Sequence, residues 1–203
     1  MAMLYEEIAA AAATRGLFAV VATTQDSPEA ERIAVQSLLH RWVDGLIRAT
    51  ARTGSPLRID GRDGSARQVL ALRTDGIHPA SIGDDHLGGY LATRKLIDHG
   101  HSRIGLIMGP EHATTAVARR DGYRDALTEA GIPLDDRLIA GDAYTMEAGE
   151  TAAHTLLNRP DPPTAIFAVN DNNAIGVMAA AAARGLRIPD DLSLIHISEP
   201  TRP

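Results

Sequence analysis

The chain has 203 residues, of which 44% are hydrophobic and 23% charged, with a formal net charge of −6. That length allows one large or two small domains, and no apolar run reaches the roughly 18–20 residues that a membrane-spanning helix needs. The lack of cysteine excludes disulfides and cysteine-ligated metal centres. The negative charge argues against broad binding of nucleic-acid phosphates. The first residues lack the basic region of a secretion signal, so we expect a cytoplasmic protein without membrane contact.

Apolar periodicity predicts the elements of the first half of the chain. A first helix ends at Gly16, and a second has Ser27 as its N-cap and Pro28 as its first residue. The inward-facing stripe of the second helix ends at Trp42. Residues 51–66 show no apolar period and are expected to form a loop. The predicted strands cover residues 17–24, 45–50, 68–72 and 80–82, and a third helix covers residues 86–99.

The second half of the chain alternates more regularly between strands and helices. Strands that alternate with helices form βαβ units, and these build parallel sheets. The sequence therefore predicts an α/β protein with two Rossmann-like lobes, residues 1–101 and 102–195, and a ligand site at the carboxyl ends of the strands, between the lobes. The predicted strands are 103–108, 138–140, 165–169 and 191–197; the helices are 115–130, one around Ala152, and one from Asp171 to Gly185 whose buried stripe is Ile175, Met178, Ala179 and Ala182.

Three stretches resemble one family of bacterial transcription regulators. GDDHLGGYLATRKLIDHGHSRIGLIMGP (83–110) resembles the segment that joins the lobes in the lactose/galactose-repressor (LacI/GalR) family. ARRDGYRDALTEAGIP (118–133) is similar to the helix that follows, and PPTAIFAVNDNNAIGVMAAAAARGLRIPDDLSLI (162–195) to a late strand–helix–strand element. Residues 3–45 are similar to the start of the family's core. The resemblance implies a type I periplasmic-binding-protein-like sensor core that binds a small effector and dimerises.

The resemblance also implies a core that is truncated at both ends and therefore incomplete. In the family, a helix-turn-helix head, a hinge and a first core strand precede the region matched here. From about His196, the tail HISEPTRP departs from the family and resembles translated sequencing adapter. We therefore expect residues 196–203 to be non-native. Ser198 stands where the family has a ligand-contacting aspartate.

Arg119 is the leading candidate for a ligand contact. Tyr123 and Leu127 follow it at helical spacing, so a permanent cation begins an otherwise inward-facing stripe. A buried guanidinium requires carboxylate, hydroxyl or ligand oxygens to satisfy its donors. The resemblance implies that this arginine contacts the effector, and the alternative is an internal ion pair with Asp142 or Asp171.

Polar side chains at the ends of strands are further candidates. Asp84 matches an aspartate in the family's D-[ND]-x-x-G-G motif, where a carboxylate can accept hydrogen bonds from two ligand hydroxyls. Alternatively, Asp84 or Asp85 only caps the following helix. Asn170 and Asp171 end a buried strand and open a helix, where an amide suits recognition of a polyol. Helix capping alone would account for Asp171.

The resemblance adds two residues from other loops. Tyr144 matches an aromatic residue that stacks on the effector in relatives, if Ala143 is counted as an insertion; surface packing is the alternative. Thr115 corresponds to a small hydroxyl residue of some relatives. Ala113 stands where purine-responsive members carry arginine, so a sugar or related polyol is expected ahead of a nucleoside.

Metal and enzymatic sites are not indicated by any motif. His99 and His101 flank the glycine at a helix end and have no third ligand at motif spacing. The sequence has no dinucleotide-binding fingerprint, Walker A motif or nucleophile elbow. We therefore predict no metal, no cofactor and no enzymatic activity.

The sequence thus predicts the effector-sensing core of a LacI/GalR-type transcriptional regulator. The parent protein would bind operator DNA as a homodimer through a head that this chain does not contain, and the effector would shift the dimer's affinity for DNA. The alternative is a sugar-binding protein of a transport system with the same fold. A helix-turn-helix or a signal peptide encoded upstream would distinguish the two.

Overall fold

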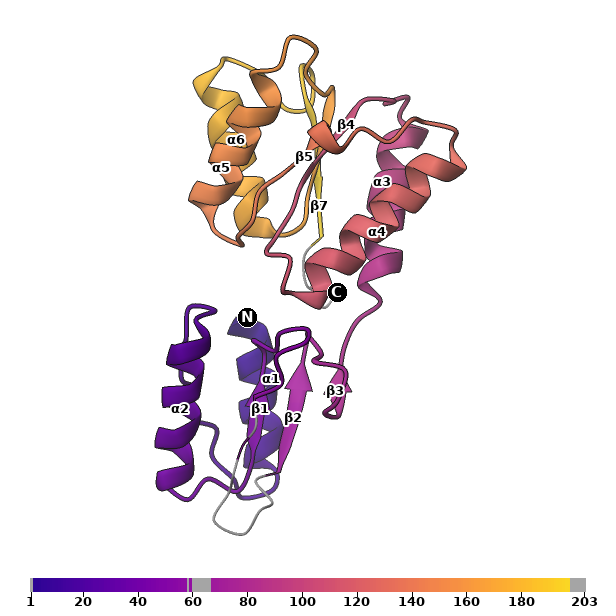
Figure 1. The fold of residues 1–203 in the computed structure, drawn as a ribbon. Helices are drawn as coiled ribbons and strands as arrows, with labels where there is room; N and C mark the ends of the chain where they lie inside the picture. The colour runs from indigo at the N-terminus through magenta and orange to yellow at the C-terminus, as the bar shows by residue number, and fades with distance from the viewer. Residues whose placement is uncertain (1, 58, 60–66, 198–203) are drawn as a thin grey trace. The chain divides into compact units, whose positions relative to one another are not determined.

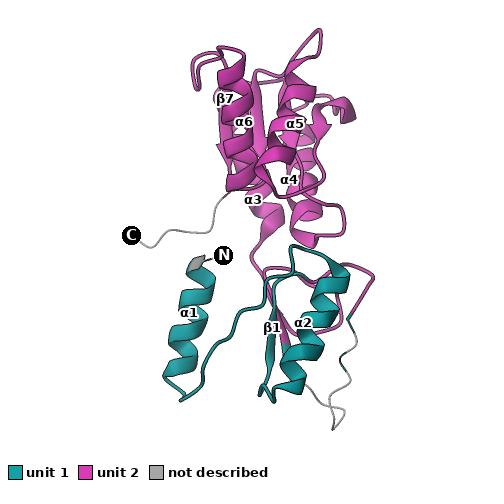
Figure 2. Ribbon diagram, turned by 90° about the vertical axis from the view of Figure 1, so that its left-hand side faces the viewer, with its two compact units in different colours: residues 1–50, 57–68 teal, residues 51–56, 69–203 magenta. Residues whose placement is uncertain are grey.

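A computed structural model describes residues 2–57, 59 and 67–197 (Figure 1). The chain divides into two compact units, which we call the first unit (residues 1–50 and 57–68) and the second unit (residues 51–56 and 69–203) (Figure 2). Residues 51–57 form neither helix nor strand, in agreement with the predicted loop. Of the rest of that loop, only residue 59 belongs to the described residues.

Two predicted helices and one predicted strand form in the first unit. Gly16 follows the first helix with φ at 70°, in the left-handed region that glycine adopts without strain. The second helix begins at Ser27, whose Oγ accepts a hydrogen bond from the Ala30 N–H at 3.3 Å, as predicted for an N-cap. The elements are α1 (Ala2–Ala13), α2 (Pro28–His40) and β1 (Leu46–Arg48).

A buried ion pair joins α2 to β1. Glu31 Oε1 accepts hydrogen bonds from Arg48 Nε at 3.0 Å and from Thr50 Oγ1 at 2.7 Å. Both charged side chains are less than a tenth exposed. Each charge therefore has the partner that makes its burial tolerable. Neither position belongs to a motif that would predict the pair from sequence.

The strand predicted over residues 17–24 is wrong. The segment has no regular structure, and its large apolar side chains are exposed, with Phe18 at 98%. A strand needs a neighbour to pair its backbone N–H and C=O groups, and no strand among the described residues pairs with this segment. Trp42, predicted to end the inward stripe of α2, lies beyond the helix with φ at 59° and is 75% exposed.

The second unit is built around a four-stranded parallel sheet with the order β5-β4-β6-β7. Phe167 in the central strand β6 lies opposite Leu106 on one side and Ile195 on the other. Two further strands, β2 and β3, pair in parallel with each other. The elements are β2 (Gln68–Ala71, its first residue counted with the first unit), β3 (Ala80–Ser81), α3 (Asp85–Asp98), β4 (Ile104–Ile107), α4 (Thr114–Glu129), a 3-10 turn (Asp136–Leu138), β5 (Ile139–Ala140), α5 (Met146–Leu157), β6 (Ala165–Ala168), α6 (Asp171–Ala183) and β7 (Ser193–His196).

Helices cover both faces of this sheet (Figure 1). Helices α3 and α4 lie on one face and α5 and α6 on the other, and the strands contribute alternate residues to the two buried clusters. The result is a three-layer α/β/α arrangement, which confirms the predicted α/β class with parallel sheets. The first layer of the core contains Leu96, Leu106, Tyr123, Leu127 and Phe167, and the second contains Ile107, Leu156, Ile166 and Val177.

Helix α3 packs on the C-terminal sheet. Ala92 and Leu96 of α3 belong to the same buried cluster as Ile104 of β4, although the predicted lobe boundary at 101/102 places α3 in the N-terminal lobe. Gly89 of α3 and Gly122 of α4 allow this packing, because a methyl group at either would collide with the backbone of the other helix. We place α3 with the C-terminal sheet on this evidence, and the two-lobe division otherwise stays a prediction.

The stripe predicted to be buried in α6 faces solvent instead. Ile175 and Met178 are both about half exposed, and the buried apolar side is formed by Ala174, Val177 and Ala181. This helix is apolar almost all round, so the period alone does not select a face. Gly176 lies on the side of α6 that packs closely on α5, because a methyl group there would collide with the backbone of α5.

The predicted non-native tail begins inside the last strand. His196 ends β7 opposite Ala168, and Ile197 packs against the core cluster of α3 and α4. Residues 198–203, including Ser198, lie outside the described residues. The assignment of the tail as non-native stays a prediction.

Candidate functional site

The predicted site residues lie around the carboxyl ends of the strands in the second unit's sheet. Tyr144 lies in the loop after β5, and Asn170 follows β6 after a single residue. Thr115 lies in the first turn of α4, and Asp84 directly precedes α3. In a parallel α/β fold, the carboxyl ends of the strands and the N-termini of the helices meet at the same end of the sheet, and such folds bind ligands there.

Arg119 is part-buried, and its guanidinium is engaged by protein oxygens. Nε donates to Asp85 Oδ1 at 2.8 Å, and Nη2 lies 2.7 Å from the same oxygen. Nη1 donates to the backbone carbonyl of Val169, the residue before Asn170. The alternative of an internal ion pair thus names the wrong partners: the carboxylate is that of Asp85, supplied by the first turn of α3, and neither of the predicted aspartates.

Asp84 forms the contact that its structural alternative predicts. Its Oδ1 accepts a hydrogen bond from the Leu87 N–H at 2.9 Å and so caps α3. Its neighbour Asp85 has the partly buried carboxylate, which contacts Arg119. Of the two adjacent aspartates, Asp84 caps the N-terminus of α3 and Asp85 pairs with Arg119.

Asn170, and not Asp171, caps α6. Asn170 Oδ1 accepts a hydrogen bond from the Asn173 N–H at 2.8 Å. Asp171 is the first helical residue, and its carboxylate is exposed and lies 2.9 Å from Nδ1 of His196. The prediction that Asp171 caps this helix is therefore wrong by one residue. Contact of either residue with a ligand stays a prediction.

Tyr144 and Thr115 are brought together by the fold. A hydrogen bond of 2.7 Å joins the Tyr144 hydroxyl to Thr115 Oγ1, and the guanidinium of Arg73 lies 5.3 Å from the centre of the tyrosine ring. Burial raises the pKa of Tyr144, and the Thr115 hydrogen bond and the nearby arginines offset part of that rise. Gly109 leaves space for the ring, since a methyl group there would collide with it.

Two asparagines of α6 hold the Tyr144 loop in place. Asn172 Nδ2 donates to the Tyr144 carbonyl at 3.0 Å. Asn173, which is fully buried, donates from Nδ2 to the carbonyls of Ala143 at 3.0 Å and Thr145 at 3.2 Å. Sequence reasoning missed this role. The sequence carried no clear signal for it, because the apolar period of α6 does not select the face on which Asn173 and Val177 lie.

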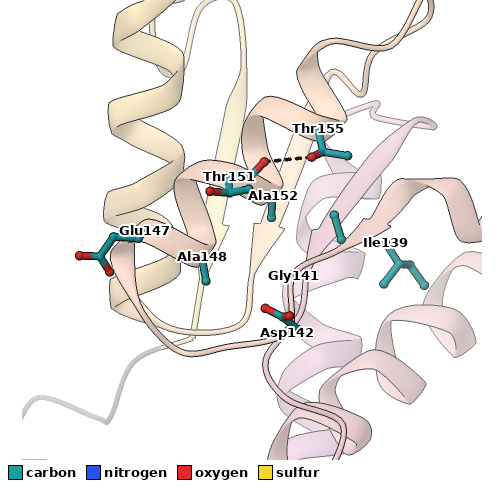
Figure 3. A pocket seen from close by; sticks show the side chains of 9 residues that line it. Ile139, Gly141, Asp142, Glu147, Ala148, Thr151, Ala152 and Thr155 are labelled. Carbon is teal, nitrogen blue, oxygen red and sulfur yellow. Dashed lines mark hydrogen bonds between the residues drawn. The ribbon is translucent and has the colours of Figure 1, made fainter. Parts of the chain in front are cut away.

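Two of the hollows formed by the described residues lie on the second unit. The smaller, of about 170 Å³, lies beside the predicted residues. The larger, of about 600 Å³, follows the edge strand β5 and α5 (Figure 3) and is bordered by Asp142, Glu147 and two threonines. None of the predicted site residues borders the larger hollow, and of them Asp84 borders the smaller one, together with Asp85, the partner of Arg119. The smaller hollow is lined by Leu72, Thr74, Ile82, Gly83, Asp84, Asp85, His86, Thr114 and Ala118.

Neither a cluster of metal ligands nor a candidate membrane span occurs in the described part of the chain. Within residues 2–57, 59 and 67–197, no three acidic or histidine side chains are grouped so that they could hold a metal ion. No helix in those ranges combines the length and apolar character needed to cross a membrane.

Comparison with known proteins identifies the family. The model described as "Periplasmic binding proteins and sugar binding domain of LacI family" matches residues 2–198, and the chain belongs to this family. The ribose operon repressor of Haemophilus influenzae is 34% identical over 181 residues, which are 87% of this chain and 53% of that protein. The transcriptional repressor CytR of Escherichia coli K12 is 30% identical over 190 residues, 91% of this chain and 54% of that protein.

Solved structures agree with this assignment. The transcriptional regulator CelR in complex with cellobiose is 31% identical, with a TM-score of 0.81 over 92% of this chain and 58% of that chain. The regulator CcpA of Lactococcus lactis is 28% identical, with a TM-score of 0.79 over 95% of this chain and 73% of that one. The chain spans about half the length of the curated relatives it matches. The predicted family is confirmed.

Proposed function

We propose that this chain is the effector-sensing core of a cytoplasmic transcriptional regulator whose effector is a sugar or related polyol. The whole protein would act as a homodimer on operator DNA, and the effector would change the dimer's DNA affinity by binding its two states unequally. The operator contact would belong to a part of the protein outside this chain, since the chain corresponds to about half of its curated relatives.

One observation carries the proposal: an aromatic ring, a hydroxyl, a guanidinium and a carboxylate converge at the carboxyl edge of the sheet. Tyr144 contacts Thr115 there, and Arg119 contacts Asp85. Aromatic faces pack against the apolar faces of sugars, and paired donors and acceptors recognise their hydroxyls. The description of the matching family, which names a sugar-binding domain, supports the same ligand class.

Regulation is favoured over transport because of the relatives. The family description covers both periplasmic binding proteins and LacI-type domains. The relatives at 30–34% identity, however, are named as repressors or transcriptional regulators. A transport protein is therefore not our second candidate.

Thermal denaturation of the full chain in the presence of candidate effectors tests the proposal. The panel contains ribose, cellobiose, adenosine and cytidine, each near saturation, and unfolding is followed by circular dichroism. A ligand at 100 times its Kd stabilises the folded state by about 2.7 kcal/mol. We expect a sugar to raise the Tm, and Tyr144→Ala to remove that rise.

The matched control is Tyr90→Ala. Tyr90 lies on α3, and its hydroxyl donates to Glu129 at 2.6 Å, away from the predicted site. This variant should keep the full ligand-induced rise in Tm. The proposal is contradicted if Tyr144→Ala and Tyr90→Ala respond equally to a stabilising sugar, or if only nucleosides stabilise the folded chain.

A further inference from the structure

The guanidinium of Arg119 is neutralised by the protein itself. Two of its nitrogens contact Oδ1 of Asp85, at 2.7 and 2.8 Å, and the third donates to the carbonyl of Val169. The two charged side chains are only 18% and 14% exposed. An arginine in this state offers no unbalanced positive charge to an incoming ligand.

The hollow beside this pair is lined by apolar side chains together with two carboxylates, two hydroxyls and an imidazole. Asp84 and Asp85 both line it, together with the hydroxyl-bearing side chains of Thr74 and Thr114. None of the described residues that line it is lysine or arginine. His86, which also lines it, has its Nε2 2.9 Å from the carboxylate of Asp125. The carboxylates of Asp84 and Asp85 are the negative charges in this lining.

We propose that Asp85 is a specificity-determining residue that restricts this site to uncharged, polyhydroxylated ligands and excludes those carrying phosphate or carboxylate groups. This inference rests on the proposed function, because it names the ligand class of the same site. It goes beyond that function by assigning to Asp85 the rejection of anions.

The physical reason is an asymmetry between hydroxyls and anions. The contacts of Asp85 with Arg119 use Oδ1, so a ligand hydroxyl can donate to the carboxylate without breaking the ion pair. A phosphate has to displace the carboxylate from the guanidinium or remain beside it. Displacement leaves a partly buried charge unpaired, and proximity places like charges together. The specificity would therefore come from lowering the affinity for anions and not from raising the affinity for sugars.

Inorganic phosphate is the probe for the test, titrated into the full chain at ionic strength matched with sodium chloride. In Asp85→Asn the side chain keeps its size and loses its charge. We expect this variant to bind phosphate at least about tenfold more tightly than the wild type, which corresponds to about 1.4 kcal/mol. The double variant Asp85→Asn with Arg119→Gln should lose that gain, because the phosphate would bind at the released guanidinium.

Asp84→Asn is the matched control. It removes the same charge one residue away, and asparagine caps helices as well as aspartate does. We expect a smaller gain in phosphate affinity for this variant than for Asp85→Asn, because Asp84 lines the hollow but does not contact the guanidinium of Arg119. If circular dichroism shows that Asp85→Asn is unfolded, Asp85→Ser replaces it in the same series.

Three results would overturn the inference. The first is binding of phosphate to the wild type that Arg119→Gln abolishes. The second is a folded Asp85 variant without any gain, and the third is an equal gain in Asp84→Asn. None of these measurements uses a sugar or DNA. If no sugar raises the Tm but phosphate binding changes as expected, the proposed function is refuted and the role of Asp85 in rejecting anions stands. If a sugar raises the Tm as expected but phosphate binding does not change as expected, only the role of Asp85 is refuted.

Discussion

Two apolar runs of similar composition have opposite outcomes in this protein. The run LFAVVATT at residues 17–24, in the first unit, forms no strand, and its Phe18 is 98% exposed. The run AIFAV at residues 165–169, in the second unit, forms β6, and its Phe167 is fully buried. The difference is that β6 pairs with β4 on one side and β7 on the other. Apolar content predicts where a strand can form, and pairing determines whether it does.

The largest expected effect compares the chain's two phenylalanines. Phe167→Ala should lower the free energy of unfolding of the second unit by about 3–5 kcal/mol, through lost burial and a cavity in the core. Phe18→Ala should change stability by less than about 0.5 kcal/mol, because the side chain already contacts water. Urea denaturation followed by circular dichroism measures both. Fluorescence of Trp42, the single tryptophan, reports separately on the first unit.

The contrast between the two runs would fail in one specific way. A loss of stability from Phe18→Ala as large as that from Phe167→Ala would show that residues 17–24 are packed in solution. Pairing partners for that segment would then have to exist, and the comparison would no longer distinguish the two runs.

Sequence patterns predicted the local structure of the second unit well, and they failed where a contact or a buried face depends on tertiary packing. The helices and strands of the second unit were predicted because apolar runs alternate with stops such as Gly100 and Gly131, both of which have positive φ. The partner of Arg119 was not predicted, because Asp85 lies 34 positions away and meets it only through the close packing of α3 on α4. The cap of α6 was misplaced by one residue because the adjacent Asn170 and Asp171 are equally good caps, and the buried face of α6 failed because it depends on packing against α5.

The next prediction concerns that helix packing and uses two adjacent glycines of α3. A methyl group at Gly89 would collide with the backbone of Arg119, whereas one at Gly88 would meet only the end of the Ile197 side chain, at 3.2 Å. We expect Gly89→Ala to destabilise the second unit by about 3 kcal/mol, at the upper end of overpacking costs. Gly88→Ala should be neutral or gain a few tenths of a kcal/mol in helix propensity. Equal Tm values for the two variants would mean that α3 and α4 are less closely packed than described.

Asp75 makes the free energy of unfolding of the second unit dependent on pH in the acidic range. Burial opposes ionisation of this carboxyl, but hydrogen bonds from the backbone N–H groups of His78 and Ile77, and the contact with the His78 ring, lower its pKa to about 2. Because the folded pKa lies below the unfolded value of about 3.9, this stabilisation is complete above about pH 4 and is lost as the pH falls towards 2. It amounts to about 2 kcal/mol. Asp75→Asn should flatten the dependence of stability on pH in that window.

The control for this titration is Asp98→Asn, which removes an exposed carboxylate from the surface ion pair with Arg94. Its stability should follow the wild-type pH profile, measured by urea denaturation at a series of pH values. An unchanged slope between pH 4 and 2 in Asp75→Asn would mean that other carboxyl groups cause the acid sensitivity.

The smallest expected effects test whether the two units differ in their local structure or only in their packing. Ser27 Oγ caps α2 in the first unit, accepting from the Ala30 N–H at 3.3 Å, and Thr145 Oγ1 caps α5 in the second, accepting from the Ala148 N–H at 3.1 Å. Removing either hydroxyl costs about 1 kcal/mol of helix stability. We therefore expect Ser27→Ala and Thr145→Ala to accelerate hydrogen exchange in α2 and α5 by similar factors. If only Thr145→Ala accelerates hydrogen exchange, α2 of the first unit is already open in solution. The two units would then differ in the stability of their helices as well as in the pairing of their strands.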